Sequence, residues 1–63
     1  MYYISIVKDN KEEMTYFYNT RSNGWTSNVK IATGFINKKY AEILKTAIEL
    51  NSKMNLEVVY QVN

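Results

Sequence analysis

The chain contains neither cysteine nor histidine, and this limits how 63 residues can form a stable fold. Domains of this size bury only about 60% of the surface that the unfolded chain exposes, so many of them need disulfides, a bound metal or a second subunit. Without cysteine and histidine, disulfides and ordinary zinc sites are excluded. We therefore expect a single domain over residues 1–63 that self-associates, most simply as a homodimer.

The same absences limit the chemistry of the chain, because it has no imidazole base and no thiolate nucleophile. The two glycines, Gly24 and Gly34, are too few for a glycine-rich phosphate loop. None of the six carboxylates is marked by its position as half of a catalytic pair. We expect a protein that is not an enzyme and that uses no cofactor and no metal.

The charge balance permits several partners without demanding any of them. Eight basic and six acidic residues give a formal net charge of +2, which neither requires nor excludes nucleic acid. No apolar run is long enough for a membrane helix, and the first residues do not resemble a signal peptide. We expect no membrane association and a cytoplasmic location.

Alternation of apolar residues predicts strands in the N-terminal part. Residues 2–8 place Tyr2, Ile4 and Ile6 on one face, and residues 14–19 alternate in the same way. The polar residues 9–13 between them fit a solvated hairpin loop far better than a cation site.

The middle of the chain predicts a turn followed by a less regular segment. Asn23-Gly24 is the strongest turn signal of the chain. Residues 29–36 fit either a short strand or an irregular crossover with a bend at Gly34.

A helix and a closing strand complete the predicted elements. Asn37 is a good N-cap, and apolar residues at spacings of three and four predict a helix over 38–54. The apolar positions of this helix are Tyr40, Ala41, Leu44, Ala47 and Ile48. Residues 56–62 alternate as a last strand.

This order predicts an α+β fold, β-β-(β)-α-β, in which one helix crosses one face of a small antiparallel sheet of three to four strands. One helix covers only one face, so we expect apolar side chains on the other face to be left for a second copy or another protein. Trp25 is interpreted either as a plug over the core or as a binding anchor. The predicted partner-binding residues are the aromatic side chains Tyr3, Phe17, Tyr18, Trp25 and Tyr60.

Four basic residues form a second candidate surface, for anions or nucleic acid. Lys38 and Lys39 lie at the predicted helix start, where the helix dipole already favours anions. Arg21 and Lys30 flank the segment around Trp25, whose ring could stack on a base. The alternative is that these four residues form a solvated rim with no ligand.

Five features form a pattern across nearly the whole chain: the Tyr-rich N-terminal hairpin, Gly24-Trp25, residues 31–35, the helix from Lys38 to Leu50 and the strand from Leu56 to Val59. This pattern resembles short proteins of Firmicutes phages and mobile elements. The resemblance implies a phage accessory protein that binds and inhibits a host protein, for example a defence system. From the sequence we therefore predict a non-enzymatic protein-binding module, with a small nucleic-acid-binding protein as the alternative.

Overall fold

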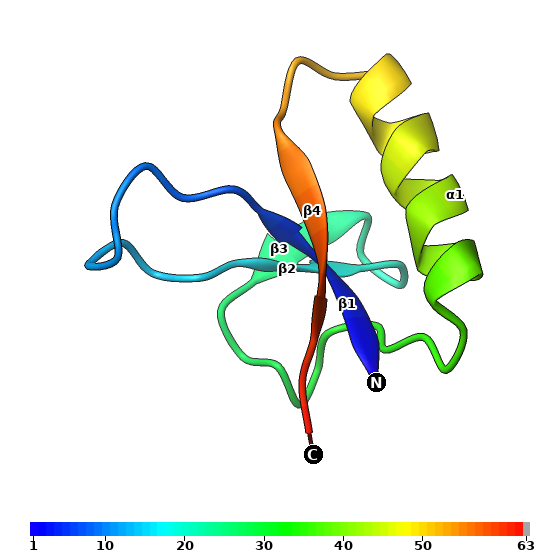
Figure 1. The fold of residues 1–63 in the computed structure, drawn as a ribbon, viewed down its shortest axis with the longest axis horizontal. Coiled ribbons are helices and arrows are strands. Elements are labelled where there is room, and N and C mark those ends of the chain that lie inside the picture. Colours follow the sequence, from blue (N-terminus) through cyan, green and yellow to red (C-terminus); the bar gives the residue numbers. More distant parts are fainter. Residues whose placement is uncertain (63) are drawn as a thin grey trace.

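The chain forms one antiparallel sheet and one helix in a computed structural model that describes residues 1–62. The elements follow in the order β1 (Tyr2–Ile6), β2 (Phe17–Asn19), β3 (Gly24–Thr26), α1 (Lys38–Leu50) and β4 (Leu56–Tyr60). The strands are arranged as β3-β2-β1-β4 (Figure 1). The first strand, β1, therefore lies inside the sheet, next to the last strand, β4, which forms one edge. The predicted α+β class, with four antiparallel strands and one helix, is confirmed.

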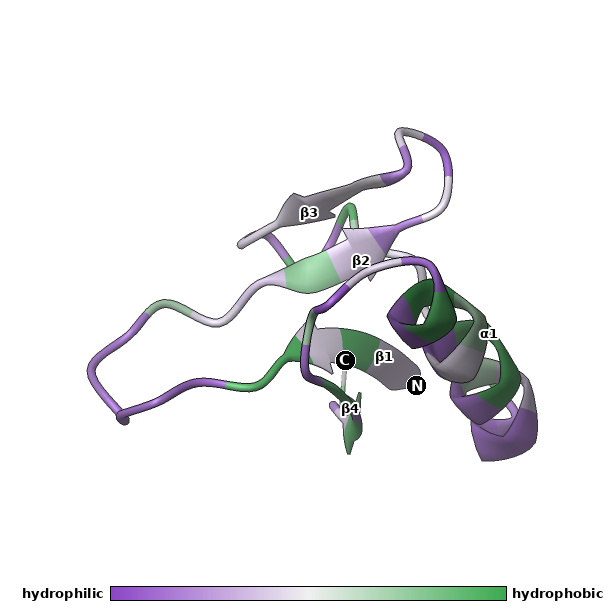
Figure 2. Cartoon of the chain, turned by 90° about the horizontal axis from the view of Figure 1, so that it is seen from above, coloured by the Kyte–Doolittle hydropathy of each residue, from purple (hydrophilic) through white to green (hydrophobic). Residues whose placement is uncertain are grey.

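The sheet face toward α1 holds the main core. Ile4 and Ala41 are fully buried there and Leu56 is nearly so, with Leu44 and Ile48 of the helix packed against them. The alternation of β1 sends every second side chain to this face. Figure 2 shows α1 on one side of the sheet, with β3 as the strand furthest from it.

The opposite sheet face is covered as well, and here the sequence-based prediction was wrong. Tyr3 and Phe17 lie on this face, yet they are only 3% and 5% exposed and their rings meet edge to face. The segment 27–35 runs from β3 past the N-terminal end of β1 to the start of α1 (Figure 1). Gly34 of this segment lies so close to Tyr3 that an added Cβ would sit 3.2 Å from the ring.

Hydrogen bonds fix this covering segment without making it a strand. Thr33 N donates to Tyr18 O at 3.0 Å, and Phe35 exchanges two backbone hydrogen bonds with Tyr2. Local acceptors turn the chain before that point, since Asn28 Oδ1 accepts from Lys30 N. The strand predicted over 29–36 is therefore absent, and the alternative, an irregular crossover, is confirmed.

The boundaries of the other predicted elements are corrected in the same way. The second strand is limited to Phe17–Asn19 rather than 14–19, and the last strand ends at Tyr60 rather than 62. The helix ends at Leu50 rather than 54. The reason is that Asn51 Nδ2 donates to Ala47 O and Ser52 Oγ donates to Ile48 O, which satisfies carbonyls at the helix end with side chains.

Candidate functional site

The five aromatic residues predicted to bind a partner do not form one exposed surface. Tyr3 and Phe17 are buried inside the domain, so a partner cannot reach them while the segment 27–35 is in place. Tyr60 is 61% exposed on β4, an edge strand, where its ring meets Tyr2 at 5.0 Å.

Tyr18 and Trp25 lie side by side on β2 and β3, and both are half-buried. Their rings are 5.2 Å apart and both pack against the core under α1. The hydroxyl of Tyr18 donates to Asn23 Oδ1 at 2.7 Å, and Asn23 holds the positive φ of 52° that the predicted turn requires. These contacts favour the interpretation of Trp25 as a plug that closes the open end of the core.

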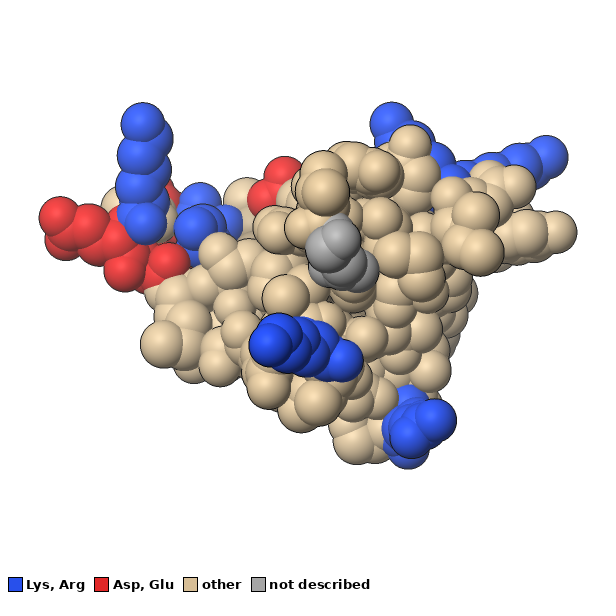
Figure 3. Space-filling model, turned by 90° about the horizontal axis from the view of Figure 1, so that it is seen from below, with Lys and Arg blue, Asp and Glu red and all other residues tan. Residues whose placement is uncertain are grey.

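The four predicted anion-binding residues come from three separate segments. Arg21 follows β2, Lys30 lies in the segment 27–35, and Lys38 and Lys39 form the first turn of α1. On the face seen in Figure 3, some basic side chains lie beside the acidic ones at one end of the molecule, and the others stand at separate places with uncharged surface between them.

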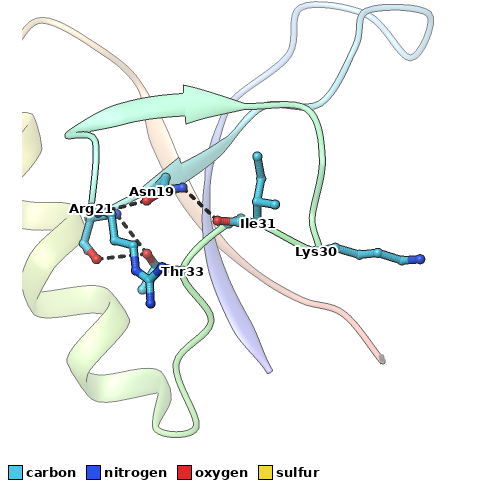
Figure 4. A pocket seen from close by; sticks show the side chains of 7 residues that line it. Asn19, Arg21, Lys30, Ile31 and Thr33 are labelled. Carbon is cyan, nitrogen blue, oxygen red and sulfur yellow. Dashed lines mark hydrogen bonds between the residues drawn. The ribbon is translucent and has the colours of Figure 1, made fainter.

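An open cleft of about 480 Å³ lies between Arg21 and Lys30, but the side chains of Asn19, Thr20 and Thr33 in its lining are already hydrogen-bonded within the domain. Asn19 Nδ2 donates to Ile31 O at 2.8 Å, and Thr20 N donates to Thr33 Oγ1 at 2.8 Å. Figure 4 shows the Lys30 side chain extending away from Arg21. The hydrogen bonds join two loops, and the two cations are not aimed at a common point.

An exposed apolar surface lies instead on α1, where the sequence-based interpretation had not placed it. We call the residues Tyr40, Ile43, Ala47 and Leu50 the outer stripe. Tyr40, Ile43 and Leu50 are 63%, 57% and 81% exposed, and Ala47 is also exposed. In Figure 2, green patches appear on the side of α1 turned away from the strands.

The spacing of the outer stripe follows from the sequence. Its members are three, four and three residues apart, which is the spacing of the apolar seam of a coiled coil. Ala41, Leu44 and Ile48 form the inner face of the same helix toward the sheet. The spacing of three and four predicted one apolar side that included Tyr40 and Ala47 together with Ala41, Leu44 and Ile48. The structure exposes Tyr40 and Ala47, so that grouping was wrong.

Ile36, at the position just before the N-cap, is a further exposed apolar residue. An apolar side chain at that position often packs against the fourth residue of the helix. That residue is Ala41, which is fully buried, whereas Ile36 stays 87% exposed. The usual intramolecular contact is therefore not made.

The first turn of α1 places positive charge at the end of the helix where the dipole is already positive, which is unfavourable for the helix. The first turn carries Lys38 and Lys39 and no acidic residue, and the last turn carries no basic residue. Asn37 caps the start by accepting from Lys39 N at 2.8 Å. The helix therefore has a strongly positive N-terminal end, and Glu49 adds negative charge near the other end.

Glu49 also connects α1 to β4. The hydrogen bond from Lys45 Nζ (3.0 Å) and a second one from Leu56 N (3.2 Å) hold the pKa of the Glu49 carboxyl below its usual value. This contact fixes how the helix lies on the sheet and leaves the outer stripe facing solvent.

Within residues 1–62, no three His, Cys, Asp or Glu side chains come together in a way that could hold a metal ion. In the same range, no helix is long and apolar enough to cross a membrane.

Fold and site together define a small α+β domain with an unpartnered apolar helix face. Comparison with known protein families, curated proteins and solved structures finds no match. The function is therefore argued from the residues of this chain.

Proposed function

We propose that this chain is a small, non-enzymatic protein-binding module that contacts its partner through the outer stripe of α1. The observation that carries the proposal is the exposure of Tyr40, Ile43 and Leu50 on one side of a single helix. The largest apolar patch on a soluble monomer typically measures a few hundred Å² and is often a functional site. A domain of 63 residues has little stability to spare, so a surface of this kind is best explained by a partner.

More specifically, we propose that the chain is a phage-encoded protein that binds and inhibits a host protein. This proposal rests on the resemblance of the sequence pattern and on the small size of the domain. The outer stripe would then contact the host protein or would hold two copies together to present another surface to it.

A photo-crosslinking experiment tests the binding proposal. A photoreactive phenylalanine analogue at position 43 should give a discrete adduct with a second protein chain in cells of a low-GC Gram-positive bacterium. The matched control carries the analogue at position 14, since Met14 is similarly exposed but lies in the β1–β2 loop. Absence of an adduct from position 43, or equal adducts from both positions, would contradict the proposal.

Nucleic-acid binding is the alternative, and a salt titration distinguishes it from protein binding. A binder that used Arg21, Lys30, Lys38 and Lys39 would release counterions, so its affinity for a labelled single strand would fall steeply with salt. We expect no saturable binding at 150 mM salt, roughly the physiological ionic strength. Saturable binding that is lost in Lys38→Glu plus Lys39→Glu would favour nucleic acid over the protein-binding proposal.

A further inference from the structure

We propose that the outer stripe binds a second copy of this chain, with the two α1 helices packed antiparallel across a two-fold axis level with position 45. The inference rests on the proposed function and names the partner for that surface. It also differs from the expectation of a dimer through the sheet, since the sheet face in question is covered by the segment 27–35.

The first argument is the order of side chains along the stripe. In an antiparallel pair centred at position 45, Tyr40 meets Leu50 of the other copy and Ile43 meets its Ala47. Each layer then combines a larger with a smaller side chain, and the small Ala47 allows the helices to approach at the centre. A parallel pair would stack Tyr40 on Tyr40 and leave Ala47 opposite Ala47, which packs less evenly.

The second argument is electrostatic. The N-terminal turn carries Lys38 and Lys39 with no acidic residue, and the last turn has no basic residue. The N-terminal end therefore carries charge that its own dipole disfavours, whereas the only charged residue of the last turn is Glu49, which is paired with Lys45. An antiparallel copy brings the positive end of each helix beside the negative end of the other, whereas a parallel copy would set like ends together.

The third argument is the area available. At roughly 200 Å² for a large side chain, Tyr40, Ile43 and Leu50 together expose on the order of 400 Å². Specific interfaces start at about 600 Å² per partner, so the exposed side chains that flank the outer stripe on α1, Lys39 and Thr46 among them, must supply the remainder. A hollow of about 310 Å³ beside Ile43, lined also by Lys39, Glu42 and Thr46, is a place where a partner side chain can insert.

The absence of cysteine allows a direct test by crosslinking single-cysteine variants. With a rise of about 1.5 Å per residue, the two copies of position 46 lie only about 3 Å apart along the axis of an antiparallel pair, whereas the two copies of position 50 lie about 15 Å apart. Packed helix axes lie about 8–10 Å apart and position 46 flanks the outer stripe, so its two Cα atoms are too far apart for a disulfide, which needs about 7 Å. A thiol-specific crosslinker with a spacer of about 10 Å, roughly the distance between packed helices, should therefore link Thr46→Cys to itself and should not link Leu50→Cys.

Two further variants complete the test. Adding Ile43→Glu to Thr46→Cys should reduce the crosslinked fraction at least about 10-fold at equal concentration, as expected for losing a central apolar contact. Adding Met14→Glu, the same type of change at another exposed apolar residue, should leave the fraction unchanged. Circular dichroism confirms that each variant keeps the helix.

The outcomes separate this inference from the proposed function. Crosslinking of Leu50→Cys but not Thr46→Cys would overturn the antiparallel arrangement in favour of a parallel one. Failure of both variants to crosslink, with a monomeric native mass, would overturn the second copy as the partner. In that case an adduct from position 43 with another protein would still support the binding module, and its absence would reject both.

Discussion

The sheet and the helix of this domain differ in how completely the chain covers them. Both faces of the sheet are covered, one by α1 and the other by the segment 27–35, so that Ile4 and Tyr3 are both buried. The helix is covered on its inner face only. Ala41 is fully buried, whereas Ile43, two residues further on, is 57% exposed. Similar apolar side chains thus stabilise the fold on one side and remain available to a partner on the other.

The largest difference in the free energy of unfolding is expected between substitutions of a buried and of an exposed isoleucine. Ile4→Ala removes a fully buried side chain between α1 and the sheet and should lower the free energy of unfolding by about 3 kcal/mol. Ile43→Ala should cost less than about 1 kcal/mol at concentrations where the chain is monomeric, because surface positions contribute little. Urea denaturation at low protein concentration measures both, and equal losses would contradict the distinction between the two sites.

The next effect tests the second cover of the sheet. Gly34→Ala would place a Cβ 3.0 Å from Met1 Cε and 3.2 Å from both Met1 Cβ and Tyr3 Cε1, so the Met1 and Tyr3 side chains or the segment 27–35 must move by a few tenths of an ångström. We expect a loss of about 1–2 kcal/mol in the free energy of unfolding. Gly24→Ala, where the nearest atom is Ser22 Oγ at 3.3 Å, is the matched control with the smaller loss. A neutral Gly34→Ala would show that the segment does not pack closely on the sheet.

A smaller effect concerns the start of α1, which orients both of its faces. Asn37→Ala removes the acceptor for Lys39 N and should lower the free energy of unfolding by about 1 kcal/mol. Asn37→Ser keeps an acceptor at the N-cap and should restore most of the loss. Thermal unfolding followed by circular dichroism distinguishes the two variants; equal loss in both would show that the cap hydrogen bond contributes little.

The smallest expected effect is on the pH dependence of folding stability, through Glu49 at the contact between α1 and β4. The pKa of Glu49 is lowered in the folded state by Lys45 and by Leu56 N, so its contribution to stability is complete above the pKa of the unfolded carboxyl. That contribution is lost as the pH falls through the lower pKa of the folded state. Glu49→Gln should therefore flatten the loss of stability in the acid range, measured as urea midpoints between neutral and acidic pH.

The control for this measurement is Glu12→Gln, the same chemical change in the exposed β1–β2 loop. If Glu12→Gln flattened the acid loss as much as Glu49→Gln, the lowered pKa of Glu49 would not be its source.

Much of the fold is predictable from local signals in the sequence. The period-two pattern of Tyr2, Ile4 and Ile6 identified the strand, and these residues do face α1. Asn37 marked the helix start and Asn23-Gly24 marked the turn, because both depend on side-chain and backbone preferences within a few residues.

The candidate site was harder to predict because it depends on what covers each face. Apolar residues at spacings of three and four occur on both sides of α1, so the spacing alone does not show which side faces the sheet. Tyr40 was therefore grouped with Ala41, although Tyr40 is exposed and Ala41 is buried. The burial of Tyr3 and Phe17 depends on an irregular segment held by long-range hydrogen bonds such as Thr33 N to Tyr18 O, which no local pattern encodes. The regular 40–43–47–50 spacing was the available signal for the outer stripe.

The most direct test of the central claim is the mass of the native chain in solution by light scattering over a dilution series. A chain of 7.4 kDa that pairs through the outer stripe should show twice that mass at high concentration and dissociate on dilution. Ile43→Glu should remain monomeric throughout, and Met14→Glu should behave like the native chain. A native mass that stays at 7.4 kDa, or a dimer that survives Ile43→Glu, would contradict the assignment of the outer stripe as the surface that holds two copies together.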